Sequence, residues 1–193
     1  VEIPLEAAKV GLLGLGTVGG GTATVLLRNA DEIQRRLGRR IEITHAAGLG
    51  IADQTILDAS KVKLTEDAFE VVNDPDVDII VELIGGYTLA KDLVMKAIEN
   101  GKHVVTANKA LIATHGAEIM QAAMAKGVNV AYEAAVAGGI PIIKALREGL
   151  AANRIDWIAG IINGTGNFIL TEMRDKGRDF EDVLKDAQAL GYA

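Results

Sequence analysis

Short apolar segments alternate with longer segments of helical periodicity along the first two-thirds of the chain. The apolar segments contain few polar residues, which is typical of strands covered on both faces. We expect strands at 9–14, 41–47, 77–84, 102–107 and 128–134. Between them we expect helices near 18–37, 66–72, 88–99 and 114–126, which end in the stop signals Gly38, Asn73-Asp74-Pro75, Gly101 and Gly127.

The repeated alternation of strand and helix predicts right-handed crossovers and a parallel sheet. We therefore assign residues 1–135 to an α/β domain with a Rossmann-like, doubly wound parallel sheet. After residue 135 the pattern changes to a Gly-Gly turn, a helix with Pro141 in its first turn, a strand at 154–164 and helices near 167–176 and 179–190. Residues 136–193 are predicted to begin a second, α+β domain. Its sheet is incomplete, so we expect the chain to be part of a longer protein or a partner to supply the remainder.

Composition narrows the classes of function. The formal charge of −6 argues against nucleic acid as the main partner, and the basic residues between Arg28 and Arg40 fit a solvated helix face. Charged residues interrupt every long apolar run, so no membrane span is expected. The chain has no cysteine, which excludes disulfides and thiolate chemistry and fits a reducing cytoplasm.

The segment KVGLLGLGTVGGG contains the pattern G-x-G-x-x-G, formed by Gly14, Gly16 and Gly19, between the first strand and the first helix. The first glycine permits a tight turn, the second lets the main chain approach a pyrophosphate, and the third lets the helix pack on the strand. A tight turn without a ligand is the alternative. The strand before, the helix after and the repeated βα units favour a dinucleotide site.

The second part of the dinucleotide pattern is absent. An acidic residue about 20 positions further on usually binds the ribose 2′-hydroxyl, and an arginine nearby a 2′-phosphate. The second strand ends in AAGLG (46–50), which offers neither, although Asp53, Lys61 and Lys63 follow. The choice between NAD and NADP therefore stays open.

Two further loops leave strands at the same predicted edge of the sheet, where α/β proteins bind ligands. In ELIGGYT, Gly85 and Gly86 would permit close approach of a nicotinamide ribose, or they form a flexible turn with Thr88 as helix cap. In TANKALIA, Lys109 would stabilise negative charge that develops during hydride transfer. Taken alone, the residue pattern favours a solvent-exposed lysine.

Two polar segments are weaker candidates. Glu133 in YEAAVAGGIP could bind a hard cation together with loop carbonyls, but such a glutamate more commonly accepts N–H groups of the turn. In INGTGNF, Asn163 and Thr165 would donate to a small polar substrate or cap a helix. The three histidines lack metal-ligand spacing, and the single serine, Ser60, lacks the setting of a hydrolase nucleophile.

Taken together and in this order, GLGTVG, ELIGG, TANKALIA, YEAAVAGGIPII and INGTGNFILTEM resemble the homoserine dehydrogenase family. The resemblance runs from Lys9 to the last residue and is specific from Val81 onward. It implies an enzyme that interconverts L-homoserine and L-aspartate 4-semialdehyde with NADP or NAD, in the synthesis of threonine, methionine and isoleucine. It also implies a Rossmann domain, a dimerisation region and a catalytic domain, assembled as a homodimer or homotetramer.

The resemblance also implies roles for individual residues. Those matching the family's cofactor contacts are Leu15, Thr17 and Val18 of the glycine loop, Lys109 beside the nicotinamide, and Gly191 at the junction of cofactor and substrate. Thr165 matches a residue at the border of the substrate pocket. Glu133, Val136, Gly138 and Ile140 match the family's sodium site, three of them through main-chain carbonyls.

The sequence departs from the family in two places. AAGLG stands where many relatives carry an arginine for the 2′-phosphate, which puts a preference for NADP in doubt. The family continues beyond Gly191-Tyr192-Ala193 into an acidic stretch, an aspartate and a lysine used for substrate binding and proton transfer. We therefore expect this chain to bind cofactor but to show little or no turnover by itself, with Lys109 as a supporting cation.

Two other functions share some of these features. A dinucleotide-binding regulatory or sensor module without chemistry would use the glycine loop, but it gives no reason for Lys109, Glu133 and the N-G-T segment together. A semialdehyde-forming dehydrogenase that proceeds through a cysteine thioester is excluded because the chain has no cysteine.

Overall fold

The computed structural model describes residues 5–51, 54–161 and 163–191. The chain divides into two compact units, Val1–Gly149 and Leu150–Ala193, which are described separately. Residues 136–149 thus group with the first unit, although we predicted that the second domain begins at residue 136. The assignment of domains itself stays a prediction.

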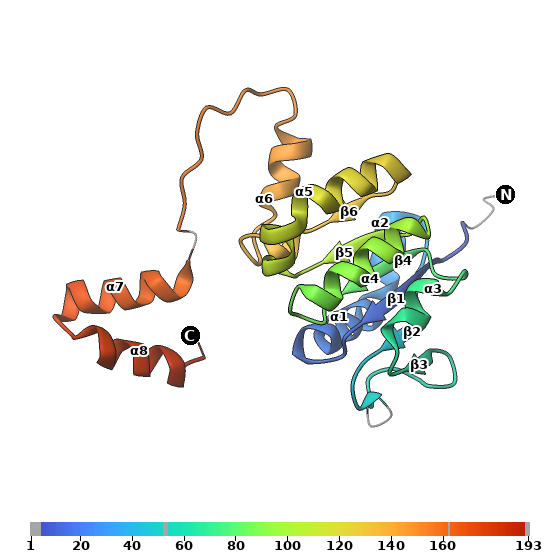
Figure 1. Ribbon diagram of the computed structural model, residues 1–193, viewed down its shortest axis with the longest axis horizontal. Helices are drawn as coiled ribbons and strands as arrows, with labels where there is room; N and C mark the ends of the chain where they lie inside the picture. Colours follow the sequence, from blue (N-terminus) through green and yellow to red (C-terminus); the bar gives the residue numbers. More distant parts are fainter. Residues whose placement is uncertain (1–4, 52–53, 162, 192–193) are drawn as a thin grey trace. The chain divides into compact units, whose positions relative to one another are not determined.

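The first unit contains a six-stranded sheet in which every strand pair is parallel. Its strands are β1 (Ala8–Leu13), β2 (Ile41–Ala47), β3 (Lys63–Thr65), β4 (Ile79–Glu82), β5 (His103–Thr106) and β6 (Val130–Ala131). They lie in the order β3-β2-β1-β4-β5-β6, so the chain winds outward in both directions from the β1/β4 pair (Figure 1). This confirms the predicted α/β, Rossmann-like fold.

Helices cover both faces of this sheet. They are α1 (Thr17–Arg28), α2 (Ala30–Leu37), α3 (Ala68–Asn73), α4 (Thr88–Glu99) and α5 (Lys109–Lys126). After β6 a short 3₁₀ helix, η2 (Glu133–Ala135), leads to α6 (Ile142–Lys144) and the π-helical turn η3 (Ala145–Gly149). None of the helices in the described part of the chain is both long and apolar enough to cross a membrane.

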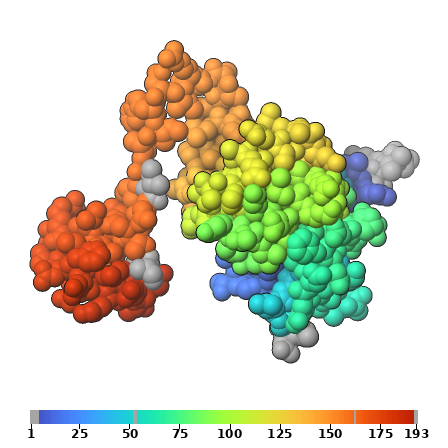
Figure 2. Space-filling view, viewed as in Figure 1, coloured from blue at the N-terminus to red at the C-terminus, as the bar shows by residue number. Residues whose placement is uncertain are grey.

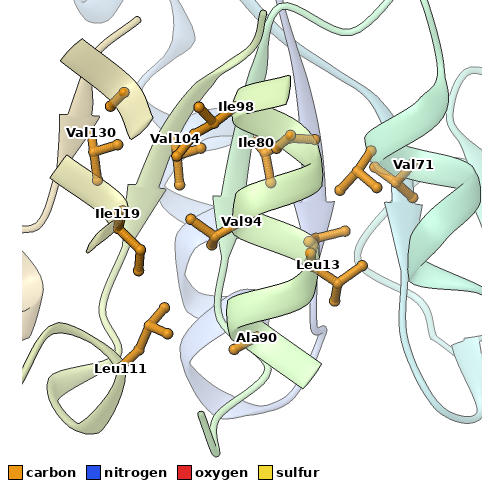
Figure 3. Close-up of a cluster of buried hydrophobic side chains, with 14 of the residues drawn as sticks. Leu13, Val71, Ile80, Ala90, Val94, Ile98, Val104, Leu111, Ile119 and Val130 are labelled. Atoms are coloured by element: carbon orange, nitrogen blue, oxygen red, sulfur yellow. The ribbon is translucent and has the colours of Figure 1, made fainter. Parts of the chain in front are cut away.

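The core has two layers because alternate residues of each strand point to opposite faces of the sheet. Leu13, Ile80 and Val104 pack against α3, α4 and α5 on one face (Figure 3). Leu12 and Val81 pack on the other face in a cluster with Ala23 of α1. In the space-filling view the green and yellow atoms of α4 and α5 cover the first of these faces (Figure 2). Burial on both faces explains why the two central strands, β1 and β4, consist mainly of apolar residues.

Several predicted elements differ from those observed. The helix expected at 18–37 is divided at Asn29, and the helix expected from residue 114 begins at Lys109. The strand expected at 128–134 contains only Val130–Ala131, since the chain then turns into η2. The strand β3 was not predicted, because three residues are too few to show a period.

The second unit contains two packed helices, α7 (Gly164–Lys176) and α8 (Phe180–Ala189). Ile169 of α7 packs against Val183 and Ala187 of α8. Arg178 between the helices pairs with Asp186 at 2.7 Å. The strand predicted at 154–164 is wrong for its described residues: 154–161 form no strand, and Gly164 begins α7, while residue 162 lies outside the described residues. A strand needs a neighbour to accept its hydrogen bonds, and the described part of this unit contains none.

Candidate functional site

The β1/β4 pair is the point at which the strand order reverses. In open parallel sheets, ligands bind in the crevice outside the carboxyl ends of the strands at this point. The register aligns Leu13 of β1 with Glu82 of β4, and Glu82 with Thr106 of β5. The three loops singled out in the sequence follow these three residues, so they begin side by side at one edge of the sheet.

The three glycines of the first loop lie in different surroundings. A Cβ atom on Gly19 would lie 1.9 Å from the carbonyl oxygen of Gly14, so helix α1 can approach the turn only with glycine at this position. Gly14 has φ +93°, and a Cβ there would lie 2.7 Å from the carbonyl oxygen of Leu83. Gly16, by contrast, has nothing within 4 Å of its Cβ position. Packing within the protein therefore requires glycine at positions 14 and 19, whereas Gly16 leaves its main chain open to a ligand.

The N-terminus of α1 begins at this open glycine. Gly16 is the N-cap residue, no side chain accepts a hydrogen bond there, and the first turn contains no acidic residue. Thr17 and Val18 of this turn are exposed, and Leu15 is half-buried beside them. The uncapped N–H groups and the positive end of the helix dipole make this turn suited to a phosphate group.

The loop after β4 is fastened to the loop after β5 by a buried carboxylate. Glu82 is fully buried, and it accepts hydrogen bonds from the main-chain N–H of Ile84 at 2.9 Å and from the hydroxyl of Thr106 at 2.6 Å. The hydroxyl of Thr106 in turn accepts the N–H of Asn108 at 3.0 Å. The Asn108 side chain donates to the carbonyl oxygen of Gly86. The two loops are thus linked in two places.

Lys109 is the first residue of α5, directly after this network. The side-chain oxygen of Asn108 caps the helix by accepting the N–H of Leu111 at 3.0 Å. Lys109 is exposed, and no carboxylate of the described residues forms an ion pair with it. The helix dipole disfavours a cation at this end, so the free ammonium is not explained by stability. Its location at the carboxyl edge is consistent with the predicted role, and the role itself stays a prediction.

Sequence reasoning missed three residues of this edge: Glu82, Thr106 and Asn108. The signal for Glu82 was present, since it is the one acidic residue in the apolar strand IIVE. Thr106 and Asn108 carried no such signal, because a threonine at a strand end and an asparagine before a helix are common in any fold. Only the register of β4 and β5 shows that these side chains meet.

Gly85 and Gly86 have positive φ angles of +84° and +66°, and neither has an atom within 4 Å of its Cβ position. The backbone of this loop therefore requires glycine for its conformation and remains open on its outer side. Thr88 begins α4 one residue after the observed N-cap, Tyr87, whose side chain makes no capping bond. The proposed cap at Thr88 is thus wrong, and close approach of a ligand at Gly85 stays a prediction.

The end of β2 lies beside the glycine turn. A Cβ on Gly48 would lie 3.4 Å from the main-chain nitrogen of Leu15, so this residue borders the turn. Leu49 is 96% exposed and has no polar group for a ribose or phosphate. Of the substitutes considered, Asp53 lies outside the described residues. Cofactor preference therefore stays open.

Glu133 accepts main-chain N–H groups of helix α6, and not those of the turn that follows it in the sequence. Its two carboxylate oxygens accept the main-chain N–H groups of Ile143 at 2.9 Å and Lys144 at 3.0 Å, at the start of α6. The loop between them contains Ala137 in the left-handed region, with φ +47°. The described residues contain no group of three His, Cys, Asp or Glu side chains suited to a metal. A sodium site built from one carboxylate and the carbonyls of Val136, Gly138 and Ile140 is a different kind of site and stays a prediction.

The remaining predicted residues belong to the second unit. Asn163 caps α7 by accepting the N–H of Gly166 at 2.6 Å, so it takes the capping role of the two that we considered. Thr165 is half-buried in the first turn of this helix. Gly191 follows α8 with φ +74° and donates its N–H to the carbonyl oxygen of Gln188 at 3.1 Å. Their predicted substrate and cofactor contacts remain predictions.

Comparison with known proteins gives one family over nearly the whole chain. The model of the homoserine dehydrogenase NAD-binding domain matches residues 14–133, and the homoserine dehydrogenase model matches residues 141–193. The homoserine dehydrogenase of Pseudomonas aeruginosa is 65% identical over 189 residues, which are 98% of this chain and 43% of that protein. The Bacillus subtilis enzyme is 42% identical over 98% of this chain and 44% of its own length.

Solved structures agree with these matches. The crystal structure of a homoserine dehydrogenase from Thiobacillus denitrificans superimposes with a TM-score of 0.89 at 65% identity, covering 97% of this chain and 43% of that one. A hyperthermophilic archaeal homoserine dehydrogenase in complex with NADPH gives a TM-score of 0.79 at 25% identity, covering 96% and 62%. The chain spans less than half the length of the bacterial relatives described above. The sequence, the sheet topology and these matches together show that the chain belongs to the homoserine dehydrogenase family.

Proposed function

We propose that this chain is the cofactor-binding part of an enzyme that interconverts L-homoserine and L-aspartate 4-semialdehyde with NADPH or NADH. The observation that carries the proposal is the glycine turn. Gly14 and Gly19 are closed against other main-chain atoms, whereas Gly16 is open at an uncapped helix N-terminus. A structural turn needs Gly14 and Gly19, and only a ligand that approaches the backbone gives a reason for Gly16.

The proposed arrangement follows from the edge of the sheet. The N–H groups of Thr17 and Val18 would bind the diphosphate, and the open loop at Gly85 would lie along the nicotinamide ribose. When bound, the nicotinamide supplies or accepts the hydride. Lys109 would face the reacting oxygen and stabilise its negative charge as the carbonyl is reduced. Leu15 and Gly191 complete the proposed cofactor contacts, and Thr165 the substrate contact.

The finer features of the family are part of the same proposal. They are a sodium ion at Glu133, Val136, Gly138 and Ile140, a homodimer or homotetramer of the longer protein, and a cytoplasmic location. Each oxygen of Glu133 already accepts one N–H group, and a carboxylate has about four acceptor positions. The donor set is therefore compatible with a cation beside the cap.

The test of the proposed function is Lys109→Ala in the longer protein that contains this chain. We expect kcat for homoserine oxidation to fall by more than about tenfold, which is about 1.4 kcal/mol of barrier. The matched control is Lys96→Ala, because Lys96 lies in the last turn of the neighbouring helix α4, away from the carboxyl edge, and pairs with Glu99 at 2.8 Å. Equal rates for the two variants would show that Lys109 is a surface lysine. Turnover by the 193-residue chain alone would contradict the proposed need for the remainder.

A further inference from the structure

Glu82 is the one acidic side chain that is fully buried in the described part of the chain, and the proposed chemistry does not use it. A buried carboxyl group is costly because it gives up hydration. The other residues of β4, Ile79, Ile80 and Val81, are apolar, so the strand itself does not require a charge at its end. The hydrogen bonds that Glu82 accepts explain such a group best.

The position of Glu82 is central to the sheet edge. It is the last residue of β4, it is aligned with Leu13 of β1 and with Thr106 of β5, and it therefore lies at the point where the strand order reverses. On one side, Leu83 follows it and approaches the Gly14 turn. On the other side, its Oε2 atom accepts the Thr106 hydroxyl.

Only two intermediates separate the Glu82 carboxylate from Lys109. Thr106 donates its hydroxyl proton to Glu82 at 2.6 Å and accepts the Asn108 N–H at 3.0 Å, so its rotamer is fixed from both sides. Asn108 holds the loop at Gly86 and caps the helix whose first residue is Lys109. A displacement of Thr106 would therefore move the helix start and its ammonium group.

We propose that Glu82 is a positioning residue, which acts through Thr106 and Asn108 to set the place of Lys109 relative to the loop at Gly85 and Gly86. This inference rests on the proposed function, because it assigns Glu82 an effect only through Lys109. Glu82 itself makes no contact with substrate or cofactor in this scheme. Its effect is on the geometry of the charged group, to which rates of enzymatic reactions are sensitive.

The test is a double-mutant cycle in the longer protein, with Thr106→Val and Lys109→Ala. Valine keeps the shape of threonine and removes the hydroxyl that joins Glu82 to Asn108. We expect Thr106→Val to lower kcat by about tenfold and to change the dissociation constant of NADPH by less than about threefold, since the glycine turn is untouched. In the Lys109→Ala background, the same substitution should have almost no further effect on kcat.

A conservative variant and a matched control separate positioning from general destabilisation. In Glu82→Gln the amide oxygen can still accept the Ile84 N–H, and the amide nitrogen can donate to Thr106, so kcat should stay within about threefold. Glu82→Leu has neither link, and we expect a loss of about tenfold or more. Asn100→Ala removes a comparable link at the opposite edge, from Asn100 to the Val72 carbonyl at 2.8 Å, and should leave kcat unchanged.

The outcomes distinguish the two proposals. If Lys109→Ala is slow and Thr106→Val lowers kcat by the same factor in both backgrounds, the effects are independent and the role of Glu82 is overturned while that of Lys109 stands. If Lys109→Ala is itself without effect, both proposals fail. If Asn100→Ala lowers kcat as much as Thr106→Val at equal loss of stability, the network is structural only, and the inference is again overturned.

Discussion

The two edges of the same sheet treat polar groups in opposite ways. At the amino edge, the buried Lys102 donates from Nζ to the carbonyl oxygens of Asp74 at 2.5 Å and Val77 at 2.7 Å. Asp78 there accepts the N–H of Lys9 at 2.8 Å. At the carboxyl edge, the helix N-terminus at Gly16 is uncapped and Lys109 has no ion-pair partner among the described residues. These polar groups of the amino edge are satisfied within the protein, whereas the helix N-terminus at Gly16 and the ammonium of Lys109 are left open.

This difference indicates where stability and where binding are determined. Groups that are satisfied within the fold contribute to its stability, whereas the uncapped N–H groups of a helix N-terminus are available to an anionic ligand. Glu82 is the exception at the carboxyl edge, because it is buried and satisfied. Glu82 joins the loops after β4 and β5 at this edge. Substitutions at the two edges should therefore separate effects on unfolding from effects on cofactor binding.

The largest effect is expected for Gly19→Ala. The new Cβ would lie 1.9 Å from the Gly14 carbonyl oxygen, so α1 must move away from the turn. We expect the free energy of unfolding to fall by about 3 kcal/mol and NADPH binding to be lost, as measured by urea denaturation and by titration. Gly21→Ala is the control in the same helix, since nothing lies within 4 Å of its Cβ position. Equal stability of the two variants would contradict the observed geometry.

Lys102→Met should destabilise the fold without affecting the cofactor site. The substitution leaves the carbonyl oxygens of Asp74 and Val77 buried without a donor, at a cost of about 2–3 kcal/mol. The dissociation constant of NADPH should change by less than about twofold. A change in affinity as large as that in stability would show that the two edges are not separable.

Lys102 also predicts a pH dependence of stability. Burial lowers the pKa of the Lys102 ammonium below its ordinary value of 10.5, against the attraction of Asp74, Asp78 and Asp76. Between the folded and the unfolded pKa the unfolded chain binds more protons, so stability rises with pH in that window. The difference in unfolding free energy between the native protein and Lys102→Met should therefore grow as the pH approaches 10.5 from below.

Gly16→Ala should have the opposite profile. No atom lies within 4 Å of the Cβ position of this residue, and its φ of −65° suits alanine. The free energy of unfolding should therefore change by less than about 1 kcal/mol. A methyl group there lies where the diphosphate would approach, and we expect binding of NADPH to weaken by at least about tenfold, or 1.4 kcal/mol. Unchanged affinity would place the cofactor elsewhere.

The smallest effect is expected for Asp74→Asn. Burial raises the pKa of the Asp74 carboxyl, but the Asp76 N–H and the buried His45, at 2.8 Å, outweigh it and hold the pKa below 3.8. A lowered folded pKa contributes stability that is present above 3.8 and is lost as the pH falls through the folded value. We expect the variant to lose about 1 kcal/mol at pH 7 and less at pH 3, measured by urea denaturation. An equal loss at both pH values would contradict this sign.

The sequence predicted the parts of the fold that local patterns determine. The bounds of β2 and α4 agree with the predicted ranges, because an apolar run and a helical period are both complete within those residues. The first residue of α5 was missed, since it depends on the cap at Asn108, and the strand at 154–164 was wrong because no neighbouring strand is present in the described unit.

The candidate site likewise contains residues that local patterns predict and residues that only long-range contacts bring together. Gly14, Gly16 and Gly19 were found from their spacing, whose physical basis is local. The link from Glu82 to Asn108 begins with the hydrogen bond between Glu82 and Thr106, which lie 24 positions apart in the sequence. Only the parallel register of β4 and β5 brings these two residues together. Contacts of this kind depend on topology and have no period in the sequence.

The most direct test of the open edge is a titration of the 193-residue chain with NADPH and with NADH, followed by nicotinamide fluorescence. Saturable binding of at least one of them, weakened in Gly16→Ala and unchanged in Lys102→Met, is the predicted result. If neither cofactor binds to a chain that unfolds cooperatively, the carboxyl edge is not a dinucleotide site.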